Sequence, residues 1–130
     1  MQLYSTNDKS HIVSLEEAVF RGLPPDNGLY LPTEIPSLPS SFIENLNKYS
    51  MQQIAIEVCK TLFKGYIPES TVERIVNQSI TFEAPLINLH ENTYVLELFH
   101  GPTLAFKDFG ARFMAQLMAY FLAVSYTHLT

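Results

Sequence analysis

Residues 100–113 read HGPTLAFKDFGARF, and this stretch places one lysine, Lys107, at the front of the most apolar part of the chain. Between Thr93 and Val124 the charged residues are only Glu97, Lys107, Asp108 and Arg112. An ammonium group is costly to bury and is rarely found among aromatic side chains without a reason. We therefore expect a desolvated Lys107 with a lowered pKa, whose neutral amine is able to form a Schiff base with an aldehyde.

A structural interpretation of Lys107 stands beside the chemical one. A lysine at a helix start can lay its aliphatic stem along apolar neighbours and extend its ammonium group into solvent. Physical chemistry alone favours this second interpretation, so the chemical one needs further support from the surrounding sequence.

The first half of the chain predicts short elements. A strand is expected at Leu3 to Ser5. Ser14 and Glu17 have the spacing of a capping box, which predicts a helix running to Phe20 or Arg21 and stopped by Gly22. Five prolines between Leu23 and Pro39 exclude a long helix there, although Gly28 to Leu31 is compatible with a brief strand.

Helices are predicted in the middle of the chain. Ser40 to Tyr49 favours a modest helix, and Ser50 with Gln53 repeats the capping pattern. The residues behind Ser50 fall at helical spacing and indicate an amphipathic helix ended by Gly65: Met51, Ile54, Ala55, Val58, Cys59 and Leu62. Pro68 suits the first turn of a further helix, whose inner face would be Val72, Ile75 and Val76.

The last third predicts a hairpin followed by the lysine helix. Pro85 to Leu89 and Thr93 to Phe99 are rich in strand-forming residues, with a turn between them. Gly101 and Pro102 break the second strand. Thr103 is then the expected cap of a long helix that carries Lys107 and continues through Phe121.

Composition indicates a piece of a larger protein. The 130 residues are 47% hydrophobic and only 16% charged, against about 25% charged residues in an average soluble domain. Part of the surface is therefore expected to be covered by polypeptide beyond this chain.

The same composition excludes several classes of partner. A net charge of -5 argues against a nucleic-acid surface. The apolar run from Phe113 to Val124 is shorter than the ~20 residues of a membrane span, so we expect no membrane partner. One cysteine and four histidines without ligand spacing argue against a metal site. The cysteine, Cys59, suits a reducing compartment, and the N-terminus lacks a signal-peptide pattern, so the cytoplasm is the expected location.

The run from Leu96 to Gln116 closely resembles the active-site lysine segment of the threonine synthase family, pyridoxal-phosphate enzymes of fold type II. The opening MQLYST and the segment Asp26 to Pro32, DNGLYLP, are similar to the same family. The resemblance implies an α/β fold: a small N-terminal α/β domain at residues 1–89, then at residues 90–123 the beginning of a fold type II cofactor domain similar to that of the tryptophan synthase β subunit. Residues 124–130 do not resemble the family's continuation and are expected to be an atypical tail, truncated or not native to the protein.

The resemblance also implies a function for the complete enzyme. That function is the conversion of O-phosphohomoserine and water to threonine and phosphate, with pyridoxal 5'-phosphate as cofactor and Lys107 as the lysine that holds it. The residue before this lysine, Phe106, would lie against one face of the cofactor ring; ordinary core packing is the alternative. The phosphate contacts would come mostly from later sequence, so the chain alone is expected to be inactive. Its oligomeric state stays open.

Structural roles are the simpler expectation for the neighbours of the lysine. Asp108 and Arg112 lie four residues apart and predict a pair on the helix surface. The alternative is that Asp108 orients neighbouring groups at the site. His100 is expected to be a satisfied turn residue that lines no site.

Two rival functions are compatible with the sequence. One is another fold type II lyase with the same lysine chemistry, such as a threonine dehydratase or a threonine-synthase-like phospholyase. The other is a non-catalytic interaction domain that uses the apolar helix from Phe113 to Leu122 to bind a partner.

Overall fold

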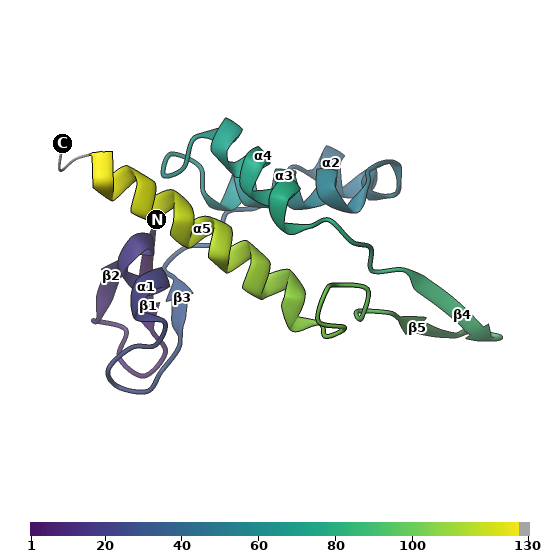
Figure 1. The fold of residues 1–130 in the computed structure, drawn as a ribbon, viewed down its shortest axis with the longest axis horizontal. Coiled ribbons are helices and arrows are strands. Elements are labelled where there is room, and N and C mark those ends of the chain that lie inside the picture. The colour runs from purple at the N-terminus through teal and green to yellow at the C-terminus, as the bar shows by residue number, and fades with distance from the viewer. Residues whose placement is uncertain (128–130) are drawn as a thin grey trace.

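A computed structural model describes residues 1–127 as two groups of elements joined by one long helix (Figure 1). The first group contains three strands and a helix: β1 (Gln2–Ser5), β2 (Ile12–Ser14), α1 (Leu15–Arg21) and β3 (Tyr30–Pro32). The strands form an antiparallel sheet in the order β2-β1-β3, in which Leu3 lies opposite Val13 on one side and Pro32 on the other.

The second group is helical. It contains α2 (Ser40–Glu44), a 3₁₀ turn at Leu46–Lys48 (η1), α3 (Met51–Leu62) and α4 (Glu69–Ser79). The hairpin formed by β4 (Leu86–His90) and β5 (Thr93–Leu96) follows and extends away from the body. The last element, α5 (Lys107–Thr127), returns across the molecule and packs on both α4 and α1.

One core lies where these groups meet α5. Val76, fully buried on α4, is at its centre with Ile75 and Val72, which confirms the predicted inner face of that helix. Leu3 contributes from the sheet and Leu117 from α5. The long helix is therefore the part that joins the N-terminal sheet to the helical group.

The helix caps follow the sequence closely. The Ser14 hydroxyl accepts from the Glu17 amide at 3.1 Å, and Gly22 ends α1 with a φ of 76°. Ser50 and Gln53 form the complete capping box expected at the start of α3. The box at Ser14 is only half formed, because the Glu17 carboxylate instead pairs with Arg21 at 3.0 Å.

Several predicted boundaries were wrong. β2 was not expected, and β3 lies at Tyr30–Pro32 where Gly28 to Leu31 was predicted. The predicted helix from Ser40 to Tyr49 is interrupted at Asn45, whose side-chain amide donates to the Ser41 carbonyl at 2.7 Å. An asparagine side chain that satisfies a helix carbonyl in this way competes with the backbone and ends the helix.

The face of α3 also differs in part from the prediction. Ala55, Cys59 and Leu62 pack against the core as expected, whereas Met51 and Val58 are more exposed. α3 ends at Leu62, and Gly65 follows in the next turn with a φ of 79°.

The predicted atypical tail at residues 124–130 stays a prediction. Val124 to Thr127 form the last turn of α5, and residues 128–130 lie outside the described residues. Within residues 1–127, no helix combines the length and the hydropathy that a membrane crossing requires.

Candidate active-site lysine and its supporting turn

Lys107 is the first residue of α5, and its side chain is exposed. The predicted burial of this lysine was therefore wrong for the described residues. Its apolar sequence neighbours explain the difference, because Leu104 and Phe106 are themselves 74% and 73% exposed and do not cover the amine. Within residues 1–127, the Lys107 ammonium has no hydrogen-bond or ion-pair partner.

The turn that precedes Lys107 is held by a buried carboxylate. Asp108 is only 3% exposed. One of its oxygens accepts from the Thr103 amide at 2.8 Å and the other from the Thr103 hydroxyl at 2.6 Å. These bonds, the Thr103 hydroxyl first, lower the pKa of Asp108, so this group is held as an anion. The turn is thus closed by a charge-assisted pair of hydrogen bonds.

Thr103 is not the helix cap that the sequence predicted. Its hydroxyl donates to Asp108 and does not accept from a helix amide, and α5 begins at Lys107. The chain between them turns through Leu104 at a φ of 59°. A left-handed residue cannot continue a right-handed helix, so the helix starts four residues later than Thr103.

Gly101 lets the carboxylate sit where it does. A Cβ added to Gly101 would lie 2.5 Å from an oxygen of Asp108 and 2.7 Å from its Cβ. A side chain at position 101 would therefore displace Asp108, which explains the glycine without reference to its backbone angles.

Arg112 fixes the first turns of α5 to the end of α4. Its guanidinium donates to the backbone carbonyls of Ser79 at 3.0 Å and Gln78 at 3.1 Å. The predicted pair between Asp108 and Arg112 is wrong, because each binds a different partner. Asp108 nevertheless fixes the turn before Lys107, and Arg112 fixes the helix after it, so both position the lysine.

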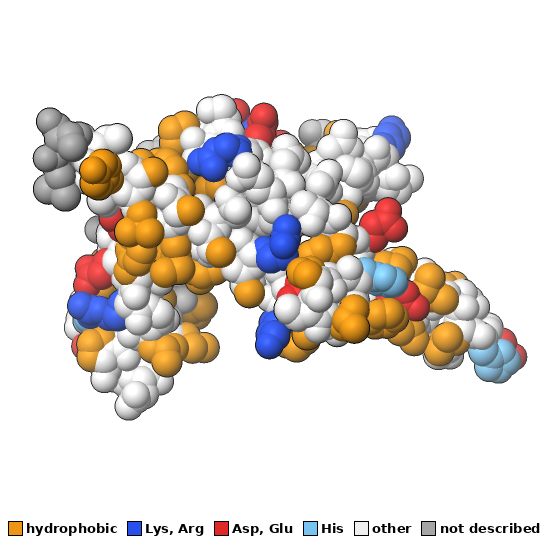
Figure 2. Space-filling view, viewed as in Figure 1, with side chains coloured by type: hydrophobic (Ala, Val, Ile, Leu, Met, Phe, Trp, Pro, Cys, Tyr) orange, Lys and Arg blue, Asp and Glu red, His pale blue; other side chains and the backbone are white. Residues whose placement is uncertain are grey.

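Phe106 is not a core residue. Its side chain is 73% exposed beside Lys107, so within residues 1–127 it packs into no core. Phe99 and the hairpin are also widely exposed, and Figure 2 shows hydrophobic side chains gathered along the hairpin end of the molecule. An uncovered amine thus lies next to an uncovered aromatic ring.

His100 is a satisfied turn residue, as expected. Its Nε2 lies 2.7 Å from a carboxylate oxygen of Glu97, and its ring stacks on Phe99 with centroids 4.7 Å apart.

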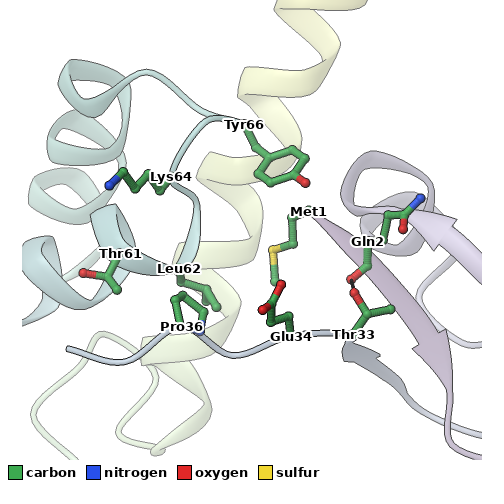
Figure 3. Close-up of a pocket in the computed structure, with 9 residues that line it drawn as sticks. All are labelled: Met1, Gln2, Thr33, Glu34, Pro36, Thr61, Leu62, Lys64 and Tyr66. Carbon is green, nitrogen blue, oxygen red and sulfur yellow. Dashed lines mark hydrogen bonds between the residues drawn. The ribbon is translucent and has the colours of Figure 1, made fainter.

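A pocket of about 240 Å³ lies elsewhere, between the N-terminal sheet and the end of α3 (Figure 3). Met1 and Glu34 face each other in it, whereas the Lys64 ammonium points away. Its lining includes neither Lys107 nor the turn before it. The opposite charges do not converge, so this pocket is not a second candidate site. In the part of the chain that the structure describes, no cluster of three or more histidine, cysteine or acidic side chains could hold a metal ion.

Comparison with known proteins identifies the family. The family model described as "Threonine synthase N terminus" matches residues 2–80. The chain belongs to the threonine synthase family. The threonine synthase of Haemophilus influenzae is 43% identical over 119 residues, which are 92% of this chain.

Solved threonine synthases share the fold as well. The crystal structure of the Escherichia coli enzyme superposes with a TM-score of 0.85 at 37% identity over 92% of this chain. The "PLP bound Threonine synthase" of Brucella melitensis superposes with a TM-score of 0.85 at 38% identity over 96%. The chain spans 28% of the length of each of these three relatives. The match confirms the predicted α/β architecture as the N-terminal part of a threonine synthase.

The sequence singles out Lys107 and Phe106 as candidate site residues, but it did not predict the turn that precedes them. The partners of Asp108 lie five and seven residues earlier, at Thr103 and Gly101. A hydroxyl residue placed five positions before a carboxylate, with a glycine two positions earlier, was the available signal. The same threonine also suits the role of a helix cap, which is why the sequence predicts a cap there.

Proposed function

We propose that the polypeptide containing this region is a threonine synthase that converts O-phosphohomoserine and water to threonine and phosphate with pyridoxal 5'-phosphate. Family membership and the superposition on the cofactor-bound Brucella melitensis enzyme support the reaction class. Because this chain spans 28% of its relatives, the activity belongs to the longer polypeptide.

The residues around Lys107 fit this cofactor. The proposal assigns Lys107 to hold its aldehyde through the side-chain amine, and Phe106 to lie against its ring. The observation that carries the assignment is an amine without a partner in residues 1–127, projecting from the first turn of α5 beside a ring that is 73% exposed. When bound, pyridoxal phosphate supplies an electron-withdrawing system that lets a substrate carbon release its proton.

The chain's own residues then have three tasks. Lys107 accepts and returns protons at its Nζ atom while the substrate is bound. Asp108 and Thr103 hold the turn before it, and Arg112 holds the helix that carries it. The exposed apolar surface formed by Phe99, Leu104 and Phe106 excludes water once the rest of the enzyme covers it. We also propose the predicted division into a domain at 1–89 and the beginning of the cofactor domain at 90–123.

A hybrid enzyme tests the assignment. Residues 1–123 are joined to the remaining part of the Haemophilus influenzae threonine synthase and expressed in a host that lacks its own enzyme. The hybrid is expected to restore threonine production, and Lys107→Ala is expected to abolish it. Lys64→Ala, an exposed lysine of another face, is the matched control and should retain activity. A threonine dehydratase would form no threonine from O-phosphohomoserine.

Borohydride reduction of the loaded hybrid provides the second measurement. Reduction should leave the cofactor attached to the peptide that contains Lys107. Label on another lysine, or threonine production by the Lys107→Ala hybrid, would contradict the assignment.

The cytoplasm is the proposed location. Reducing conditions suit the single cysteine Cys59, which is partly buried. Fractionation of cells that express the tagged protein tests the proposal, and recovery from a membrane or exported fraction would refute it.

A further inference from the structure

The loop between α1 and β3 contains Asn27-Gly28, the one Asn-Gly dipeptide of the sequence. Asn-Gly is the dipeptide most prone to deamidation, because glycine has no Cβ to obstruct its own backbone nitrogen. In this reaction the Gly28 nitrogen attacks the side-chain carbonyl carbon of Asn27. A new C–N bond forms, the bond to the side-chain nitrogen breaks, and ammonia leaves. Water then opens the resulting five-membered imide to aspartate or isoaspartate.

The attacking nitrogen is engaged in the folded chain. The Gly28 amide donates to Asp26 Oδ1 at 2.9 Å. The Ser5 hydroxyl lies 2.7 Å from each Asp26 oxygen, and Ser5 is completely buried. The attack requires the Gly28 amide to lose its proton. A carboxylate that accepts this proton in a hydrogen bond opposes the negative charge that would develop there.

The backbone on both sides of Gly28 is also held in place. A Cβ built on Gly28 would overlap the Ser5 hydroxyl, so glycine and serine are in close contact. Asn7 donates from its side chain to the Asp26 carbonyl at 2.9 Å, and the Leu29 amide donates to the Thr6 hydroxyl at 2.8 Å. These bonds fix the residues on either side of Gly28 and so oppose a movement of its nitrogen toward the Asn27 side chain.

We propose that Asn27 is a site of deamidation that the Ser5–Asp26 pair holds back as long as the N-terminal sheet is folded. Asn27 itself is exposed, so water has access to any imide that forms. Gly28 is buried, and its contact with Ser5 keeps the Gly28 nitrogen from attacking the Asn27 side chain.

The product would loosen the sheet irreversibly. Isoaspartate inserts one extra carbon into the backbone between Asp26 and Gly28. The following residue, Leu29, accepts from the Thr6 amide at 2.9 Å, a bond that continues the pairing of β1 with β3. A longer backbone displaces Leu29 from Thr6, and the edge strand β3 separates from β1. Isoaspartate at position 27 would therefore mark chains that have been unfolded.

The test measures deamidation of the 130-residue chain by peptide mass spectrometry after incubation in mildly alkaline buffer. The native chain is compared with the chain in urea, and isoaspartate is resolved from aspartate by chromatography. Ser5→Ala removes the hydroxyl that orients Asp26. Ser10→Ala is the matched control, since Ser10 makes the corresponding hydroxyl bond to Asp8 at 2.6 Å in a neighbouring turn.

Deamidation of Asn27 is expected to be slow in the native chain and faster by about tenfold or more in urea, the factor that a hydrogen bond to a charged group is worth. Ser5→Ala should move the native rate toward the urea rate, and Ser10→Ala should leave it unchanged. Equal rates in the native chain and in urea would overturn the proposal. So would a Ser5→Ala rate equal to that of the unsubstituted chain.

Amide hydrogen exchange distinguishes loss of the Gly28–Asp26 hydrogen bond from unfolding of the chain. In Ser5→Ala the Gly28 amide is expected to lose protection while amides of α4 remain protected. If Ser5→Ala unfolds, Asp26→Asn takes its place, because its side-chain oxygen can still accept from Gly28 but lacks the opposing charge. An intermediate Asn27 rate is expected for Asp26→Asn, and an unchanged rate would refute the role of Asp26.

Discussion

At the scale of single residues, Asp108 shows how a residue adjacent to Lys107 acquires its role. Its sequence position beside the lysine and four residues before Arg112 predicted a surface ion pair. In the structure its carboxylate is buried and bound to Thr103. The spacing of Asp108 and Arg112 suits an ion pair, but the amide and hydroxyl of Thr103 donate to the carboxylate instead.

Asp108→Asn is therefore expected to destabilise the chain. An asparagine has one acceptor oxygen, so one of the two Thr103 donors would lose its partner. The urea midpoint should fall more than in Asp8→Asn, the matched control, because a single Asp8 oxygen, Oδ1, accepts from both the amide and the hydroxyl of Ser10 in an exposed turn. Equal losses in the two variants would contradict a special role for the buried turn.

Cys59 yields a prediction about reactivity. Burial raises the pKa of its thiol to about 11. A free thiol near 8.5 reacts as thiolate, so alkylation by iodoacetamide at mildly alkaline pH is expected to be slower by about two orders of magnitude in the folded chain than in urea. Alkylation followed by mass spectrometry measures both rates. Similar rates in the two conditions would show that the α3 face opens freely.

At the scale of elements, the start of a helix depends on residues close in sequence, whereas the elements that a helix packs against do not. Ser14, Ser50 and Gly22 act where the sequence placed them, because a cap involves residues only three or four positions apart. The predicted start of α5 at Thr103 was wrong, because Leu104 adopts a left-handed conformation and the Thr103 hydroxyl binds Asp108.

Ser50→Ala is expected to lower the free energy of unfolding by about 1 kcal/mol, because it removes the acceptor for the Gln53 amide at the start of α3. Thermal and urea unfolding measure this loss. Ser37→Ala is the control, as this serine lies in the proline-rich segment outside any helix. A loss no greater than that of the control would show that the capping box does not stabilise α3.

At the scale of the whole molecule, α5 joins the N-terminal sheet to the helical group, while the hairpin and the surface around Lys107 remain uncovered. Leu86, Leu89 and Leu96 are all more than half exposed on the hairpin. Low charge had predicted such a surface, and the 28% coverage of the relatives is consistent with it.

Acid stability is a property of the whole chain, to which Asp26 and Asp108 contribute among the three aspartates with lowered pKa values. Hydrogen bonds, chiefly from Ser5 and from Thr103, lower the pKa values of Asp26 and Asp108 in the folded state. The unfolded chain therefore binds more protons near pH 4, the ordinary aspartate range of about 3.9. Their stabilisation is fully present above that pH and is lost as the pH falls through the lower folded values.

The free energy of unfolding is thus expected to decline below about pH 4. Asp108→Asn should show a shallower decline than the unsubstituted chain, since one titrating group is gone. Urea titrations at a series of pH values measure both slopes. Identical slopes would show that Asp108 does not titrate with folding.

The sequence by itself determined the order of the helices, the caps at Ser14 and Ser50, the hairpin, the inner face of α4 and the resemblance to the threonine synthase family. These features depend on neighbours within a few positions, which any one sequence displays directly. Only the tertiary structure decided that Asp108 binds Thr103 and that Arg112 binds the end of α4, 33 residues away. It also decided that Lys107 begins α5 with an exposed side chain. Those outcomes depend on which hydrogen-bond donors, carbonyls and apolar surfaces come into contact in the folded chain. Residue spacing along the sequence does not specify these contacts.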